Sequence, residues 1–364
     1  APGDVSGALC TRSEPGELEK QSRLLIRVNS QEPHTRNIQL RRPSVRAIME
    51  TEIRICNRPA YKDIDGLRLN KYFKPELYRS ALKYQPRPDD IFVVTYPKCG
   101  TTWVQHIGYL ILSKGVPPPS GLDFYRRSPF FEMFGAEAVE DMTRPGLIKT
   151  HLPYHLLPQH SQAKYLYVCR NPKDACVSYF HHTRGFHAYE FAEGKFEDYF
   201  DIYMEGENDY GDYFDHVLSW YAHRGDPNVL FINYEDIKEN PRKYVLNIAK
   251  FINNDCYNML TDNENILQDV LKYSDIKSMR EYGAENIKNF FTKPLKDNNV
   301  PPGLRTFHEL AQRYPKSTGF IRKGIVGDCK QHLTPEMHKR MEDKIMQKLS
   351  HTDLIDVWRK HDIM

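Results

Sequence analysis

Short runs of β-branched and aromatic residues alternate along the chain with segments whose apolar residues recur at helical spacing. Three runs have the length and composition of buried strands: Ile91–Tyr96, Tyr165–Cys169 and Val229–Tyr234. Helical spacing marks three further segments: Trp103–Ser113, Asp212–His223 and Arg242–Ile252. Strands that alternate with helices predict an α/β fold, with one domain built on a central parallel β-sheet that helices flank on both faces.

Three segments outside this alternation predict a disordered extension, a loop and a terminal helix. Residues 1–50 mix charged residues, Ser, Pro and Gly without periodicity, which predicts a disordered N-terminal extension to a domain of residues 51–364. Residues 280–320 contain Gly, Pro and Asn with several aromatic residues, and we expect a long lid-like loop with little regular structure. Residues 335–350 predict a charged terminal helix.

Composition narrows the classes of protein that fit. The formal net charge is only +3, so no general polyanion-binding field and no nucleic-acid partner are expected. No apolar run approaches the ~18 residues that a membrane span needs, so no membrane partner is expected either. The seven cysteines are scattered, which favours reduced thiols and a cytoplasmic protein over a disulfide framework.

The segment Thr95–Trp103 (TYPKCGTTW) joins a strand to a helix and has the chemistry of an anion site. Lys98 offers a positive charge, Gly100 permits close backbone approach, and free amides open the following helix. The first glycine of a Walker A loop is missing, and the lysine precedes the glycine that it should follow. A capped turn with a solvated lysine is the alternative interpretation.

Cys99 raises a second possibility, a nucleophilic thiolate at a helix N-terminus. A phosphatase-type loop needs an arginine six positions after its cysteine, and position 105 is glutamine. A packed or redox-sensitive thiol fits the sequence better.

Four further motifs follow this loop in a family's order: Lys149–Pro153 (KTHLP), Tyr167–His182 (YVCRNPKDACVSYFHH), Asn233–Pro241 (NYEDIKENP) and Phe320–Asp328 (FIRKGIVGD). With them, the chain from about Tyr61 onward resembles the cytosolic sulfotransferases. The resemblance implies a P-loop-like sulfotransferase fold. It also implies transfer of a sulfuryl group from 3'-phosphoadenosine 5'-phosphosulfate (PAPS) to a hydroxyl or amine of a small acceptor, with PAP as product and no metal.

Catalytic roles follow from the resemblance and agree with the chemistry of the residue types. A neutral histidine can take a proton near pH 7, and the family's general base matches His151. Lys98 would neutralise charge on the departing 5'-phosphate. Lys149 would flank the same centre, because alternate residues of an extended chain share a face. A surface lysine is the alternative for Lys149.

Donor-binding roles also come from the resemblance. The 5'-phosphosulfate loop would be Lys98, Cys99, Gly100, Thr101 and Thr102. The adenine would lie against Trp103, Tyr234, Ser274 and Met279. The 3'-phosphate would be held by Arg170 and Ser178, with Arg322, Lys323 and Gly324 contributing from the far end of the chain. Phe320 and Ile321 would lead into this last part of the nucleotide site.

The sequence defines the acceptor pocket less closely than the nucleotide site. Its candidate walls are Phe124, Phe130 and Phe131, with Phe290 and Phe291, and any of these rings could instead belong to the core. His182 stands where relatives often have an apolar residue, which favours a more polar acceptor. Phenols, catecholamines, steroids and xenobiotics all stay open as acceptors.

The sequence departs from the family pattern at several positions. Cys99 stands where serine is usual, and Cys329 stands where tryptophan is common. The family's short dimer motif is altered at two of its four positions, which disfavours a homodimer through this segment: Lys330, Thr334, Pro335 and Lys339.

Two other classes of protein remain as alternatives. A P-loop kinase or NTPase would share the sheet and the anion loop, but it needs a metal-holding aspartate that is not evident here. A catalytically inactive nucleotide-binding scaffold would not need His151 beside the phosphate contacts.

Overall fold

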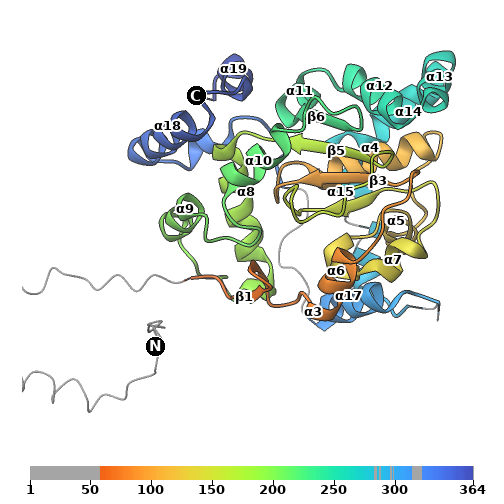
Figure 1. The fold of residues 1–364 in the computed structure, drawn as a ribbon, viewed down its shortest axis with the longest axis horizontal. Coiled ribbons are helices and arrows are strands. Elements are labelled where there is room, and N and C mark those ends of the chain that lie inside the picture. Colours follow the sequence, from red (N-terminus) through yellow and green to blue (C-terminus); the bar gives the residue numbers. More distant parts are fainter. Residues whose placement is uncertain are drawn as a thin grey trace, which may run out of the picture. The chain divides into compact units, whose positions relative to one another are not determined.

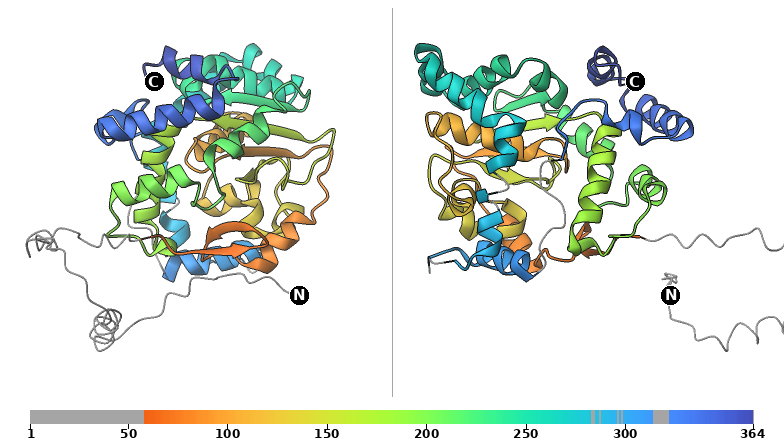
Figure 2. Two further views of the ribbon diagram at one scale, coloured as in Figure 1. Left: turned by 60° about the vertical axis from the view of Figure 1, so that its left-hand side comes forward. Right: turned by 180° about the vertical axis from the view of Figure 1, so that it is seen from behind.

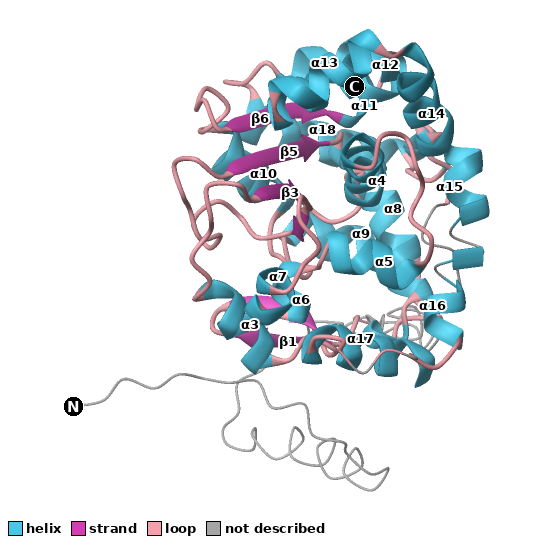
Figure 3. Ribbon diagram, turned by 90° about the vertical axis from the view of Figure 1, so that its right-hand side faces the viewer, coloured by secondary structure: helices cyan, strands magenta, loops and turns pink. Residues whose placement is uncertain are grey.

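In the computed structural model, four parallel strands form the central sheet in the order β4-β3-β5-β6 (Figure 1). Their bounds are β3 (Ile91–Thr95), β4 (Ile148–Thr150), β5 (Lys164–Cys169) and β6 (Val229–Asn233). Val93 lies opposite Lys149 on one side and Leu166 on the other. β6, β5 and β3 run side by side in Figure 3. The predicted parallel sheet is confirmed, and the three predicted strands are β3, β5 and β6.

Neighbouring residues of each strand enter different cores, as the two-residue period of a strand requires. On one face, Phe92 and Val94 join a core rich in tyrosine and tryptophan. On the other face, Ile91 and Val93 join an aliphatic core formed with α4, α12, α13 and α14. Strands that are apolar on both faces must be covered on both faces, which is why these runs do not alternate with polar residues.

Helices surround the sheet and account for most of the chain. Those before β5 are α3 (Pro75–Leu82), α4 (Thr101–Leu112), α5 (Gly121–Arg127), α6 (Phe131–Phe134) and α7 (Ala136–Glu140). Those between β5 and β6 are α8 (Pro172–Gly185), η1 (His187–Tyr189), α9 (Phe196–Glu205) and α10 (Tyr213–Tyr221). After β6 come α11 (Tyr234–Glu239), α12 (Pro241–Ile252), α13 (Asn254–Asp262), α14 (Glu264–Ser274) and α15 (Ile276–Tyr282). The last are α16 (Lys288–Thr292), α17 (Pro302–Arg313), η3 (Asp328–Gln331), α18 (Pro335–Leu349) and α19 (Leu354–Lys360).

The C-terminal helices pack beside the middle of the chain. α18 contacts both α8 and α10, and the blue helices lie next to green segments in the left view of Figure 2. Thr334 caps α18 by accepting a hydrogen bond from the Met337 amide at 3.2 Å, and Pro335 occupies the first turn. Two residues of the altered dimer motif therefore start a helix within the chain itself.

The structure describes residues 58–282, 285–286, 288–295, 297, 299–313 and 322–363. The expected extension of residues 1–50 lies outside them, and the described residues belong to one compact unit. A hairpin of β1 (Tyr61–Ile64) and β2 (Leu67–Asn70) begins the described part. No helix in these residues has the length and apolar character to cross a bilayer.

The expectation of little regular structure over residues 280–320 is wrong. α16 and the twelve-residue α17 lie in this segment. Pro302 opens α17, where a proline's missing amide costs no hydrogen bond. Only one face of α17 is buried, through Gly303, Leu304 and His308.

Candidate active site

The carboxyl ends of all four parallel strands meet at one edge of the sheet, and a cavity of about 600 Å³ opens there. Most residues that the sequence predicted for the site line this cavity. They are Lys98, Gly100, Thr101, Thr102, Trp103, Phe124, Phe130, Lys149, His151, Arg170, Ser178, His182, Tyr234, Ser274, Met279, Arg322, Lys323 and Gly324. Residues that are far apart in the sequence thus share one site.

The loop between β3 and α4 is held in a shape that few sequences allow. Lys98 has a φ of 72° and Gly100 a φ of 99°, both in the left-handed region. A Cβ at Gly100 would lie 2.7 Å from Cδ2 of Tyr234, so a side chain would also collide with the ring. Thr101 Oγ1 lies 2.6 Å from Thr95 Oγ1, which ties the start of α4 to the end of β3.

Arg170 connects this loop to the C-terminal segment. Its guanidinium donates to the Lys98 carbonyl at 3.3 Å and to the Ile325 carbonyl at 3.2 Å. It also lies 4.6 Å from the centre of the Tyr234 ring and 3.5 Å from Asp174. Arg170 is only 6% exposed, so its charge acts inside the protein with little screening.

The C-terminal segment brings two more cations to the cavity. Arg322 and Lys323 both pair with the buried carboxylate of Asp328. Gly324 has a φ of 64°, and a Cβ there would lie 2.0 Å from Cδ1 of Ile276. This glycine therefore lets the segment pass close to the wall of the cavity.

Two buried guanidinium nitrogens show that the cavity suits an anion. Nε of Arg170 and Nε of Arg322 have no hydrogen-bond partner within the described residues. A buried donor left unpaired costs free energy, and a phosphate oxygen is the partner that a planar guanidinium fits best. The residues present therefore fit a phosphorylated ligand.

Aromatic rings and a serine carbonyl form the next part of the wall. Trp103 donates from Nε1 to the Ser274 carbonyl at 2.8 Å and meets the Tyr234 ring edge to face at 5.3 Å. The Lys238 ammonium lies 5.3 Å from the Trp103 ring, and the buried Met279 lines the same cavity. This arrangement offers a flat apolar surface of the kind that a purine ring occupies.

His151 follows β4 directly and is fixed by bonds at three points. Its Nδ1 lies 2.9 Å from the Thr95 carbonyl, which can only accept a hydrogen bond. Its backbone amide donates to Glu132 Oε1 at 2.8 Å, and its own carbonyl lies 2.9 Å from Nε2 of His216. The ring proton must therefore be on Nδ1, which leaves Nε2 with the lone pair that a base requires.

Burial and neighbouring cations control the charges at this point. Burial, followed by the charge of Lys149, holds the pKa of His151 well below its usual value. Burial lowers the pKa of Lys149 to about 8, although nearby Glu132 opposes this shift. Burial also raises the pKa of Glu132. The sequence did not identify Glu132 as a residue of the site. His151 is thus neutral, while Lys149 keeps its ammonium at neutral pH.

Two predicted site residues lie away from the cavity surface. The Cys99 side chain is fully buried, and burial raises the pKa of its thiol to about 12. Phe131 is also fully buried, where it meets Tyr84 and Phe92 edge to face. Cys99 therefore packs behind the loop, and Phe131 belongs to the hydrophobic core.

The remaining predicted site residues lie in the cavity wall, in the core or outside the described residues. Phe124 and Phe130 line the cavity, and the Lys149 ammonium lies 3.8 Å from the centre of the Phe130 ring. Phe290 is buried against Tyr125. Phe320, Ile321 and the side chain of Phe291 lie outside the described residues.

The sequence also missed several residues that line the cavity: Asn70, Phe73, Gln105, Tyr125, Met133, Tyr179, Phe186, Tyr189, Asp209, Tyr210, Lys238 and Phe307. Lys238 lies inside the motif Asn233–Pro241, so its place in that motif was an available signal. Asp209 and Tyr210 lie in a polar turn and carried no such signal.

An α/β sheet with an anion-binding strand–loop–helix and a neutral histidine defines a group-transfer enzyme that uses an anionic nucleotide. The family described as "Sulfotransferase domain" matches residues 88–353. Mouse sulfotransferase 1 family member D1 is 32% identical over 80% of this chain and 94% of its own length. Guinea pig (Cavia porcellus) sulfotransferase 1E1 is 31% identical over 76% of this chain and 91% of its own.

The solved structures agree with the sequence relatives. The crystal structure of mouse sulfotransferase SULT7A1 complexed with PAP superposes with a TM-score of 0.60 at 25% identity. It covers 82% of this chain and 98% of that one. The chain belongs to the sulfotransferase family, and the predicted family and fold class are confirmed.

Proposed function

We propose that this chain transfers the sulfuryl group of PAPS to a hydroxyl or amine of a small acceptor, with His151 as general base. One observation carries the proposal: Lys98, Lys149 and a neutral His151 line the same cavity as the buried cation Arg170. A base and an ammonium at one end of an anion cradle are what sulfuryl transfer needs. A nucleotide-binding scaffold would need only the cradle.

Several residues would hold PAPS, which supplies an activated sulfuryl group when it is bound. Arg170, Ser178, Arg322 and Lys323 would surround the 3'-phosphate, with the unpaired Nε atoms of the two arginines supplying donors. Lys98 and the amides that open α4 would hold the 5'-phosphosulfate. The complex of mouse sulfotransferase SULT7A1 with PAP supports this choice of nucleotide.

His151 would take the acceptor's proton on Nε2 as the acceptor oxygen or nitrogen forms its bond to sulfur. Lys98 would neutralise the charge left on the 5'-phosphate oxygen when the bond between that oxygen and sulfur breaks. Lys149 would stabilise the sulfonate oxygens between them. The transfer is direct, because a base is present and the thiol in the loop itself, Cys99, is buried and protonated.

The low pKa of His151 in the free enzyme serves this order of events. A neutral imidazole is ready to accept a proton, and the added negative charge of a bound sulfonate would raise its pKa toward neutrality. The base would therefore become stronger only when the donor is in place. We expect the protein to act in the cytoplasm without a metal, on a phenol, catecholamine, steroid or xenobiotic.

The test uses the purified chain and PAPS labelled with ³⁵S, with one acceptor from each of the four classes. We expect label in at least one acceptor in the presence of EDTA, and binding of PAP by calorimetry. Phosphoryl transfer from ATP with magnesium is the matched assay for a kinase. PAP binding without transfer to any acceptor would favour a scaffold, and ATP-dependent phosphorylation would overturn the proposal.

A further inference from the structure

A carboxyl group lies in the wall of the acceptor side of the cavity. Asp209 lines the cavity and is only 1% exposed. An aspartate is rarely buried without a partner of opposite charge, because removing a carboxylate from water costs much free energy. Nothing in the transfer reaction itself uses this residue.

The groups that hold Asp209 are neutral. Tyr179 donates its hydroxyl to Oδ1, and Tyr189 donates its hydroxyl to Oδ2 at 2.6 Å. The Asn70 amide is a further hydrogen-bond donor to this carboxyl. No lysine, arginine or histidine of the described residues forms an ion pair with Asp209. The carboxyl is positioned by hydrogen bonds, but its charge is not balanced.

Asp209 directly precedes Tyr210, and the Tyr210 ring packs beside His151. The Tyr210 ring meets the His151 ring edge to face with centroids 5.3 Å apart. Phe186 and the rings of Tyr179 and Tyr189 also line the cavity near the carboxyl. A small acceptor with its nucleophile at His151 would therefore lie along Tyr210 and point its other end toward Asp209.

We propose that Asp209 binds a protonated amine on the acceptor, so that the preferred substrates are phenols or alcohols that carry an alkylammonium group. This inference rests on the proposed sulfuryl transfer and names the acceptor class for it. An ammonium would supply the missing opposite charge, and the surrounding aromatic faces would attract the same cation. Neutral phenols and steroids would leave the buried carboxylate unpaired.

The state of the carboxyl is consistent with this role. Burial raises the pKa of Asp209 to about 6, although hydrogen bonds from the two tyrosines oppose that shift. The group is thus still charged at pH 7.5.

The experiment compares two acceptors of matched shape at pH 7.5. Tyramine and 4-propylphenol share the phenol hydroxyl and chain length, and only tyramine carries an ammonium. For the unmodified enzyme with ³⁵S-labelled PAPS, we expect kcat/KM for tyramine to exceed that for 4-propylphenol by about tenfold or more. This ratio needs no mutant, so it is measurable even if a variant fails to fold.

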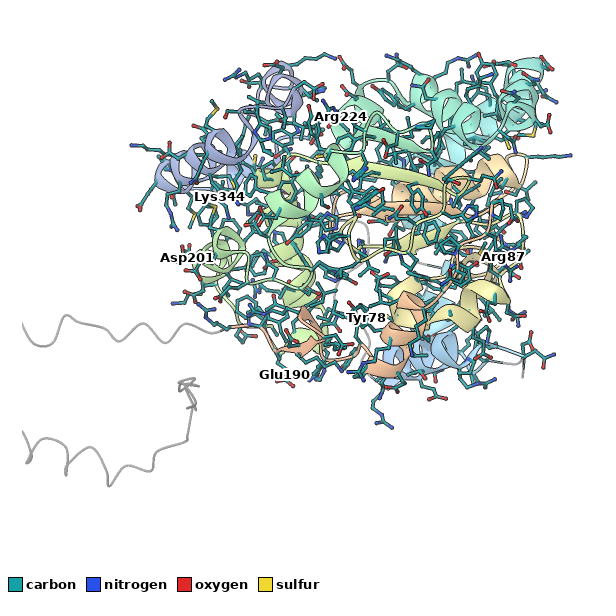
Figure 4. The ribbon with its side chains drawn as sticks, viewed as in Figure 1. Tyr78, Arg87, Glu190, Asp201, Arg224 and Lys344 are labelled. Atoms are coloured by element: carbon teal, nitrogen blue, oxygen red, sulfur yellow. The ribbon has the colours of Figure 1, made fainter. Side chains whose placement is uncertain are left out.

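The variant Asp209→Asn keeps the size of the side chain and removes its charge. We expect the tyramine to 4-propylphenol ratio to fall about tenfold or more toward one. Asp201→Asn is the matched control, because Asp201 lies at the edge of the molecule and pairs with Arg340 (Figure 4). A ratio near one in the unmodified enzyme, or an unchanged ratio in Asp209→Asn, would overturn the inference. Failure to sulfate either phenol, or a wider set of acceptors, would instead count against the proposed function.

Discussion

Replacing His151 with alanine tests the centre of the proposed mechanism. A positioned general base contributes about 10²–10⁴-fold to a rate. His151 should contribute at the lower end, because the charge of a bound sulfonate offsets only part of the effect of burial and Lys149, which hold its pKa well below the usual value. We therefore expect His151→Ala to lower kcat by about 10²–10³-fold, which corresponds to about 2.7–4 kcal/mol.

The same substitution also has a structural cost that must be separated from the catalytic one. It removes the donor that satisfies the buried Thr95 carbonyl, and an unpaired buried acceptor costs about 1–3 kcal/mol. The melting temperature should fall by a few degrees for each kcal/mol in a chain of this size, roughly 2–4 °C. The nucleotide cradle is formed by other residues, so the Kd for PAP should stay within about threefold of the unmodified enzyme's.

The assay measures initial rates with ³⁵S-labelled PAPS, with PAP affinity and melting temperature taken on the same preparation. His155→Ala is the matched control, because His155 is exposed and only four positions further along. Added imidazole should restore part of the activity of His151→Ala and none in the control. Turnover above half of the normal rate would remove His151 from the chemistry, and a large loss of PAP affinity would reassign it to donor binding.

Two further predictions concern the cations. Arg170→Ala should weaken PAP binding by about 10–100-fold in calorimetry, because a buried charge-assisted contact is worth about 1.5–3 kcal/mol. Substitution of the exposed Arg184 by alanine is its control, and equal affinities in Arg170→Ala and the unmodified protein would contradict the placement of the 3'-phosphate. Lys149 has a pKa of about 8 and carries its charge only below that pH, so kcat/KM for PAPS should fall above about pH 8. Lys149→Met should abolish this limb of the profile, and a limb that survives in the variant would mean that another group titrates there.

Much of the site could be predicted because it lies at the ends of strands. Buried β-branched runs identify strands, and parallel strands bring their carboxyl ends to one edge. The residues that follow β3, β4, β5 and β6 include Lys98, His151, Arg170 and Tyr234, and all four line the cavity. Local sequence patterns therefore predicted most residues of the nucleotide-binding part of the cavity.

The acceptor side depends on contacts that no local pattern records. Glu132 reaches the site by accepting from the His151 amide, nineteen positions away. Asp209 is held by hydroxyls twenty and thirty positions away, and in the sequence it reads as part of a polar turn. Phe130 and Phe131 are adjacent and identical in type, yet only Phe130 faces the cavity. The side chains of neighbouring residues leave the backbone in different directions, and the residue type alone does not show which of the two faces the cavity.

Helix α17 was missed for a related reason. Its buried residues include a glycine and a histidine, so it has few of the apolar positions from which helical spacing is recognised. Phe307, which lies within α17, nonetheless lines the cavity. A segment that the sequence predicted to be a loop thus contributes a helical residue to the cavity wall.

The network around Arg170 explains how residues 98 and 322–324 form one site although they are far apart in sequence. Asp174 accepts from the amides of Gly327 and Cys329 at 2.8 and 2.9 Å, which fixes the C-terminal segment to the start of α8. Arg170 lies against the same carboxylate and donates to both the Lys98 and Ile325 carbonyls. Because one buried guanidinium spans both loops, neither end of the nucleotide cradle can shift without straining the other. Loss of Arg170 should therefore loosen the grip on both phosphates together.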